Sequence, residues 1–201
     1  MGLGVFCGSS AGSVPCYREA ACAMAQAMAR RDVALIFGGG RNGLMGAVAD
    51  TVLAHGGTAI GVMPRSLMDR EIAHHGLSEL HLVESMHERK LLMAELSDGF
   101  VGLPGGAGTL DEFVEQWTWA QLGIHRKPCA LLNVRGFFDP LLAMVDRMVD
   151  EGFLRSAYAE MLVVEEQPDA LLNRLETYRP PEQKWRFLDA VSEAALAGSG
   201  R

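Results

Sequence analysis

The sequence predicts an α/β fold in which a doubly wound parallel sheet forms a single domain. Six short apolar runs alternate with segments of helical periodicity, an alternation typical of parallel strands joined by helices. The six runs span residues 3–6, 34–37, 58–62, 80–83, 99–103 and 128–133. With 201 residues and 49% hydrophobic content, the chain can bury one core of this kind but hardly two.

A glycine-rich loop follows the second predicted strand, residues 34–37, and leads into a helix. Loop residues 38–43 match the pattern G-x-G-x-x-G, which occurs in dinucleotide-binding folds. Those folds also place an acidic residue near the end of the next strand to bind a ribose hydroxyl, whereas here the strand 58–62 is followed by methionine and proline. The sequence therefore argues against NAD binding and leaves a loop that suits a phosphate.

A helix is predicted after the fourth strand, because Ser85 and Glu88 have the spacing of a capping box. Arg89 falls on the inward, apolar face of this helix. Burying a guanidinium among apolar side chains costs free energy unless it pairs with an anion or reaches a cleft. We favour a cleft. The alternatives are an internal salt bridge with Glu71 or Glu95, or a side chain that extends to solvent.

The most informative segment is residues 103–112, with the sequence LPGGAGTLDE, because it follows a predicted strand and opens a helix. Its glycines let backbone N–H groups approach a ligand closely, and the helix N-terminus adds free donors and partial positive charge. The loop therefore suits a phosphate, and Glu112 suits another part of the ligand. The structural alternative is that Thr109 and Glu112 form a capping box that needs no ligand.

After residue 133, the sequence predicts a helix at about 139–151, a short strand at 163–164 and a second helix at about 170–176. Asp139 and Pro140 suit the N-cap and first turn of the first of these helices. A proline pair at 180–181 then breaks the pattern. We therefore expect a folded domain at residues 1–180 and a C-terminal helical tail at residues 181–201.

Composition and spacing exclude several classes of function. The formal net charge is −7 and no run of lysine or arginine is present, so no nucleic-acid partner is expected. No apolar run approaches membrane-spanning length, so no membrane association is expected. The four cysteines form no C-x-x-C pair and are expected to be free thiols in a reducing cytoplasm. The histidines lack the spacing of a helical metal site, so no metal is expected.

Two motifs together carry a resemblance to a known family. Residues 86–90 (MHERK) and 104–112 (PGGAGTLDE) resemble the paired signatures of the Lonely Guy (LOG) family of cytokinin-activating phosphoribohydrolases. Residues 7–10 and 38–46 are also similar to that family, so the resemblance extends from residue 4 to about residue 164. Either motif alone would be much less specific than the combination.

The resemblance implies a Rossmann-like fold, a homodimer, and an enzyme that needs no cofactor. It implies a small-molecule substrate, an N6-substituted adenosine 5′-monophosphate, which is cleaved to the free base and ribose 5-phosphate. The family's catalytic pair corresponds to Arg89 and Glu112. Its substrate contacts correspond to Glu71, Lys90, Gly106, Ala107, Gly108, Thr109 and Thr118.

The residue chemistry is consistent with this reaction, and three alternatives stay open. A carboxylate such as Glu112 can stabilise an oxocarbenium-like sugar and activate water. Arg89 does not readily give up a proton, so it suits binding or electrostatic stabilisation better than acid catalysis. The alternatives are a nucleosidase for ordinary nucleoside 5′-monophosphates, a non-enzymatic nucleotide or cofactor carrier, and a pyridoxal-phosphate lysine decarboxylase. The last needs a lysine, and only Lys90 lies near the motifs.

Overall fold

The computed structural model describes residues 1–68 and 73–181, and within them seven strands form one parallel sheet. The strands are β1 (Gly2–Phe6), β2 (Ala34–Phe37), β3 (Ala59–Pro64), β4 (Glu79–Val83), β5 (Gly99–Gly102), β6 (Cys129–Leu132) and β7 (Leu162–Glu165). Their order across the sheet is β4-β3-β2-β1-β5-β6-β7, and every pair is parallel. The predicted doubly wound parallel sheet is therefore confirmed, with strand ends that differ from the prediction by one or two residues.

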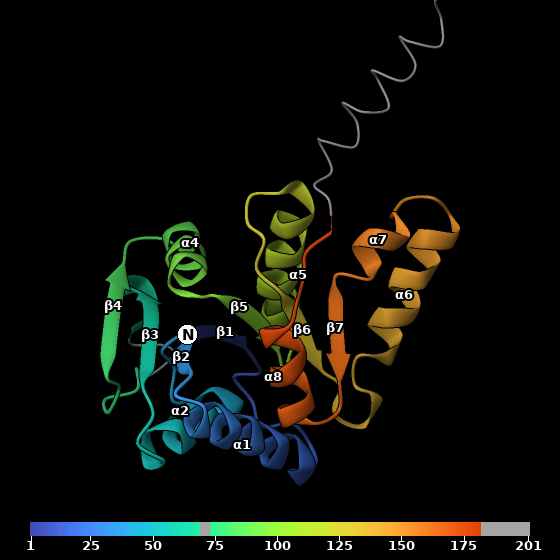
Figure 1. Ribbon diagram of the computed structural model, residues 1–201. Coiled ribbons are helices and arrows are strands. Elements are labelled where there is room, and N and C mark those ends of the chain that lie inside the picture. The colour runs from blue at the N-terminus through green and yellow to red at the C-terminus, as the bar shows by residue number, and fades with distance from the viewer. Residues whose placement is uncertain (69–72, 182–201) are drawn as a thin grey trace, which may run out of the picture.

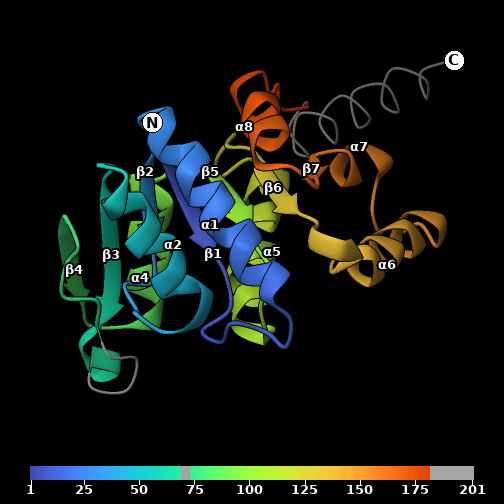
Figure 2. The ribbon, with the colours of Figure 1, turned by 90° about the horizontal axis from the view of Figure 1, so that it is seen from below.

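Helices cover both faces of the sheet (Figures 1 and 2). One face carries α1 (Pro15–Arg30), α2 (Gly43–Ala54) and α8 (Pro168–Glu176). The other carries α4 (Met86–Leu96), α5 (Ala107–Leu122), α6 (Asp139–Asp150) and the short α7 (Ser156–Ala159). Two single-turn helices, η1 (Arg65–Leu67) and η2 (Val134–Gly136), follow β3 and β6.

Alternate residues of the central strands face opposite layers, as the two-residue period of a strand requires. Val5, Leu35 and Val101 pack in the core layer beneath α1 and α2. Phe6 and Phe100 pack in the layer beneath α4 and α5, with their rings stacked at 6.0 Å. This two-sided burial explains why the strands read as continuous apolar runs instead of alternating ones.

The strand order reverses between β1 and β5, so the helices that follow these two strands leave toward opposite faces. Hydrogen bonds join the loops at this point: Gly8 N–H donates to the Pro104 carbonyl at 3.1 Å, and Leu44 N–H donates to the Gly8 carbonyl at 3.0 Å. The loops after β1, β2 and β5 therefore form one connected layer at the carboxyl edge of the sheet, where open α/β sheets bind their ligands.

The two predicted capping boxes have different outcomes. Ser85 accepts a hydrogen bond from Glu88 N–H at 3.1 Å, as expected, but the Glu88 carboxylate accepts from Glu84 N–H at 3.0 Å, one residue before the cap. The capping box of Thr109 and Glu112 is wrong, because α5 begins at Ala107 with Gly106 as its N-cap. Thr109 therefore lies inside the first turn and is not the N-cap of α5.

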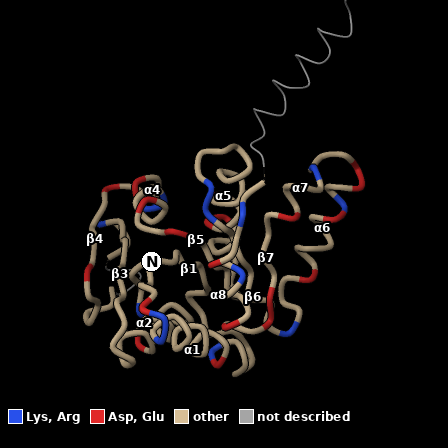
Figure 3. Tube along the Cα trace, in the orientation of Figure 1, with Lys and Arg blue, Asp and Glu red and all other residues tan. Residues whose placement is uncertain are grey.

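Charged residues of both signs are interspersed along the described chain (Figure 3). Within residues 1–68 and 73–181, no helix is both long and apolar enough to span a membrane. The expected helical tail after residue 181 lies outside the described residues.

Candidate active site

A cavity of about 360 Å³ lies between the N-terminal ends of α4 and α5. Both signature motifs contribute to it, although they are separated by a strand in the sequence. It is lined by Cys7, Ser9, Met45, Leu67, Met86, Arg89, Gly106, Ala107, Gly108, Thr109, Asp111 and Glu112. We call it the charged cavity. Among the sequence-predicted site residues, the fold thus brings together Arg89, Glu112 and the loop 106–109.

The N-terminus of α5 opens into the charged cavity without a side-chain cap. The first N–H groups of a helix have no partner within the helix, and no acidic residue lies in the first turn of α5 to offset their partial positive charge. A Cβ atom added at Gly106 or Gly108 would meet nothing within 4 Å. Packing within the chain therefore does not require these two glycines, and the open space leaves their backbone accessible to a ligand.

Arg89 and Glu112 form a largely buried ion pair on the wall of the charged cavity. The distance from Arg89 Nη2 to Glu112 Oε1 is 3.5 Å, and the two side chains are 6% and 14% exposed. Arg89 Nη1 also approaches Met86 Sδ at 3.7 Å, while its buried Nε has no hydrogen-bond partner within the described part of the chain. The preference for a cleft is supported, and the cleft also provides an anionic partner, Glu112.

Of the two alternative partners considered for Arg89, only Glu95 lies within the described part of the chain. Glu95 is exposed on α4, and Glu71 lies outside the described residues. The ion pair crosses from α4 to α5, so it joins the two signature motifs directly. Periodicity along one helix could place Arg89 on the inward face, but it could not identify a partner on another helix.

Cys7 lines the charged cavity near Glu112 and is buried. Burial raises the pKa of the Cys7 thiol, and the nearby Glu112 carboxylate raises it further. The thiol is therefore held neutral, which excludes it as a thiolate nucleophile at neutral pH. The sequence predicts Cys7 only as a free thiol within the motif of residues 7–10 and does not predict its place in the site.

Lys90 is held by two carboxylates of α5. Its Nζ lies 2.8 Å from Asp111 Oδ2 and 3.4 Å from Glu115 Oε1, and its side chain is 13% exposed. Burial alone would lower the pKa of Lys90, but the hydrogen bonds and charges of Asp111 and Glu115 outweigh it and raise the pKa. Lys90 stays beside the charged cavity and does not line it.

Thr118 is not among the residues that line the charged cavity. It is exposed on α5, six residues after Glu112, which is about 9 Å further along the helix axis. Trp117 before it packs in the core, as periodicity predicts, and donates its Nε1–H to the Tyr158 carbonyl at 3.0 Å. The predicted substrate contact at Thr118 therefore has no counterpart within this cavity.

The glycines after β2 lie close to other parts of the chain, so packing accounts for them, and phosphate binding by this loop stays a prediction. A Cβ atom at Gly38 would overlap the Arg89 guanidinium, and one at Gly43 would overlap the backbone of Ser9 and Ser10. Gly39 and Gly43 also have positive φ angles of 79° and 58°. Spacing alone could not distinguish glycines that admit a ligand from glycines that admit another part of the same chain.

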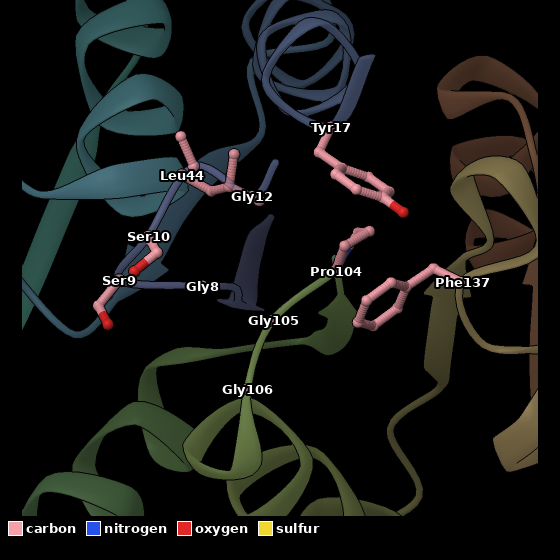
Figure 4. Close-up of a pocket in the computed structure, with 11 residues that line it drawn as sticks. Gly8, Ser9, Ser10, Gly12, Tyr17, Leu44, Pro104, Gly105, Gly106 and Phe137 are labelled. Carbon is pink, nitrogen blue, oxygen red and sulfur yellow. The ribbon is translucent and has the colours of Figure 1, made fainter. Parts of the chain in front are cut away.

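A second cavity, of about 250 Å³, lies beside the first and shares Ser9 and Gly106 with it. Tyr17 and Phe137 form one of its walls, with Pro104 between them in Figure 4, and their rings meet edge to face at 5.8 Å. We call it the aromatic cavity. No Lys, Arg, Asp or Glu is among its described lining residues.

Within the described residues, no group of three or more His, Cys, Asp or Glu side chains is arranged to hold a metal ion. Of the clustered histidines, His74 contacts Asp50 at 2.9 Å and His81 contacts Glu79 at 3.1 Å. The four cysteines are free thiols, of which Cys7 and Cys129 are buried.

Comparison with known proteins relates this chain to one family over most of its length. The family described as "Possible lysine decarboxylase" matches residues 45–175. Cytokinin riboside 5′-monophosphate phosphoribohydrolase LOG7 of Arabidopsis thaliana is 46% identical over 94% of this chain and 89% of its own. LOG5 of the same species is 47% identical over 88% of this chain and 77% of its own. The probable phosphoribohydrolase LOGL2 of Oryza sativa subsp. japonica is 46% identical over 90% of this chain and 74% of its own.

Solved structures of low sequence identity share the fold. The molybdenum cofactor binding protein of Rippkaea orientalis superposes with a TM-score of 0.67 at 18% identity, covering 88% of this chain and 95% of its own. The molybdenum cofactor carrier protein of Chlamydomonas reinhardtii superposes with a TM-score of 0.66 at 19% identity, covering 88% and 98%. These likenesses establish the Rossmann-like architecture.

Proposed function

Because the chain belongs to the family of cytokinin riboside 5′-monophosphate phosphoribohydrolases, we propose that it hydrolyses the N-glycosidic bond of an N6-substituted adenosine 5′-monophosphate. The products are the free base and ribose 5-phosphate. The observation that carries this proposal is the charged cavity, in which a free helix N-terminus and a buried Arg89–Glu112 pair face one space. Such a site combines an anion-binding end with a carboxylate suited to glycoside chemistry.

The 5′-phosphate binds at the N-terminus of α5 in this proposal. The N–H groups of Ala107, Gly108 and Thr109 supply donors, and the open space around Gly106 and Gly108 lets the phosphate reach the backbone. Glu112 lies five residues beyond Ala107, about 8 Å along the helix. That separation supports a position of its carboxylate beside the sugar and away from the phosphate.

Glu112 acts on the sugar and on water. As the bond between C1′ and the base nitrogen breaks, its electron pair goes to the base, and positive charge develops on the ribose. The Glu112 carboxylate stabilises that charge and takes a proton from the water that attacks C1′. That proton then passes to the departing base, so the reaction needs only the nucleotide and water.

Arg89 stays protonated throughout, so it acts as a fixed positive charge. Its guanidinium holds the Glu112 carboxylate in place and offers its remaining donors, including the unpartnered Nε, to the ribose or to the phosphate. Lys90 contributes through Asp111, which lines the cavity. Glu71 and Thr118 remain substrate contacts implied by the resemblance alone.

A panel of nucleotides tests the proposal, with the released base measured by chromatography. N6-substituted adenosine 5′-monophosphates should be cleaved with a higher kcat/KM than AMP, GMP or CMP. Equal rates across the panel would instead identify a general nucleoside monophosphate nucleosidase. Binding of nucleotides without release of any base would identify a carrier and would overturn the assignment as an enzyme.

The two lysines in the described part of the chain, Lys90 and Lys127, do not fit pyridoxal phosphate, despite the description of the matching family. A Schiff base requires an amine that can lose its proton, whereas two carboxylates raise the pKa of Lys90. The Nζ of Lys127 donates to the Ala94 carbonyl at 2.6 Å, at the end of α4 and outside both cavities. Purified protein mixed with pyridoxal phosphate should show no aldimine absorbance and release no carbon dioxide from lysine. Aldimine formation at Lys90 with decarboxylation would contradict this expectation.

We also propose that the protein is a homodimer and lies in the cytoplasm. Apolar side chains are exposed on and next to the two helices that carry the site: Met86 and Leu91 are 40% and 50% exposed on α4, and Ile124 after α5 is 63% exposed. A second copy that covered them would remove apolar surface from water. Light scattering during size-exclusion chromatography should give twice the chain mass of 21.7 kDa. Free, buried thiols such as Cys129 suit a reducing compartment.

A further inference from the structure

Gly38 directly follows β2 and lies against the guanidinium of Arg89. A Cβ atom at this position would overlap Arg89 Nη2 and lie 3.1 Å from Cζ and 3.6 Å from Nε. Gly38 has no positive φ, unlike its neighbour Gly39, so backbone conformation does not require a glycine here. What requires a glycine is the space that the guanidinium occupies.

The other contacts that described residues make with the Arg89 guanidinium are too loose to fix it by themselves. Its distance to Glu112 is 3.5 Å, its contact with Met86 is to a sulfur at 3.7 Å, and its Nε has no hydrogen-bond partner in the described chain. Sulfur is a weak acceptor, and an ion pair at this distance gives little directional restraint. The backbone beneath the guanidinium is therefore a major steric boundary that sets where it lies.

We propose that Gly38 is a positioning residue for the reaction: the missing side chain creates a slot that holds the Arg89 guanidinium beside Glu112. This inference rests on the proposed function for its catalytic consequence, but not for the contact itself. A methyl group in the slot displaces the guanidinium from Glu112 and from the sugar. Gly38 thus acts on the substrate only through Arg89.

A double-mutant cycle tests this coupling, with an N6-alkylated adenosine 5′-monophosphate as the substrate. We expect Gly38→Ala to lower kcat/KM by about tenfold or more in the wild-type background, and kcat at saturation to fall as well. In the Arg89→Ala background the same change should alter kcat/KM by less than about twofold, because no guanidinium remains to be displaced. Equal losses in both backgrounds, or no loss in the wild type, would overturn the proposal.

Gly4→Ala is the matched control for steric damage. Gly4 lies within β1, and its Cβ would crowd Phe100 Cδ1 at 2.8 Å and Ser97 Oγ at 2.9 Å in the core. We expect this variant to lose thermal stability while its kcat per folded molecule stays near the wild-type value. A loss of kcat equal to that of Gly38→Ala would mean that general core damage explains both variants, and the proposal would fail.

Thermal stability provides a second cycle that needs no activity. If the slot exists for the guanidinium, Gly38→Ala should lower the Tm less in the Arg89→Ala background than in the wild type, because the steric conflict is gone. An equal or larger decrease in the Arg89→Ala background would contradict the slot. Because this cycle works even on a protein that cleaves no nucleotide, failure of the proposed function and failure of the slot give different results.

Discussion

The charged cavity and the aromatic cavity share Ser9 and Gly106 but differ in almost every other property. The charged cavity is bounded by a helix N-terminus, a buried ion pair and Asp111. The aromatic cavity is walled by Tyr17, Phe137 and Pro104. Chemistry that develops charge needs fixed charges and dipoles aimed at the reacting atoms. From this difference we expect catalysis in the charged cavity and not in the aromatic cavity, although the two share a loop.

The largest effect is expected at Glu112, and its absence would remove the contrast between the two cavities. Glu112→Gln keeps the size of the side chain but removes its charge, so kcat should fall by about a hundred- to ten-thousand-fold, the range of a positioned acid–base group. Single-turnover rates measure the loss, and calorimetric binding of AMP should change by less than about threefold because the phosphate end is intact. Glu95→Gln, an exposed carboxylate on α4, is the control. Near-normal turnover by folded Glu112→Gln would reject the mechanism.

The phosphate end should give the next largest effect. Even two of the three N–H donors at the start of α5 contribute about 3 kcal/mol when they bind a charged phosphate, so AMP should exceed adenosine in kcat/KM by about a hundredfold or more. The measurement compares base release from each under identical conditions. Similar kcat/KM values for nucleotide and nucleoside would mean that the N-terminus of α5 does not bind phosphate.

Arg89→Ala should weaken binding and turnover together. Loss of charged hydrogen bonds of about 1.5–3 kcal/mol corresponds to a reduction in kcat/KM of about ten- to a hundredfold. Arg126→Ala removes an exposed arginine and should leave kcat/KM near the wild-type value. If Arg89→Ala lowers only the Tm and leaves turnover per folded molecule unchanged, Arg89 supports the fold and not the reaction.

The smallest effect is expected in the aromatic cavity and would sharpen the contrast. Phe137 is 37% exposed and packs against Tyr17 and Phe138, so Phe137→Ala should lower the Tm by a few degrees. Its kcat/KM should change by less than about threefold for both AMP and an N6-substituted AMP. A larger loss for the substituted nucleotide alone would show that the aromatic cavity receives the N6 substituent.

Local patterns in the sequence were sufficient for the fold, because apolar runs and helical periodicity are properties of neighbouring residues. They also placed Arg89 on an inward face and the loop 103–112 at a helix start. They could not show that Arg89 faces Glu112 or that Lys90 is tied to Asp111, since these pairs connect α4 to α5 across the intervening strand. The use of Gly38 was equally invisible, because its neighbour lies fifty-one positions further along the chain.

The open start of α5 has a consequence for how such a protein can change over time. Its anion-binding donors belong to the main chain, which every amino acid shares, so substitutions among the surrounding side chains leave them in place. The charged cavity is also lined by side chains such as Leu67 and Met86, which point mutations can replace one at a time. Under the proposed function, the scaffold could therefore change the group that it recognises beyond the sugar and still bind the phosphate through the main chain.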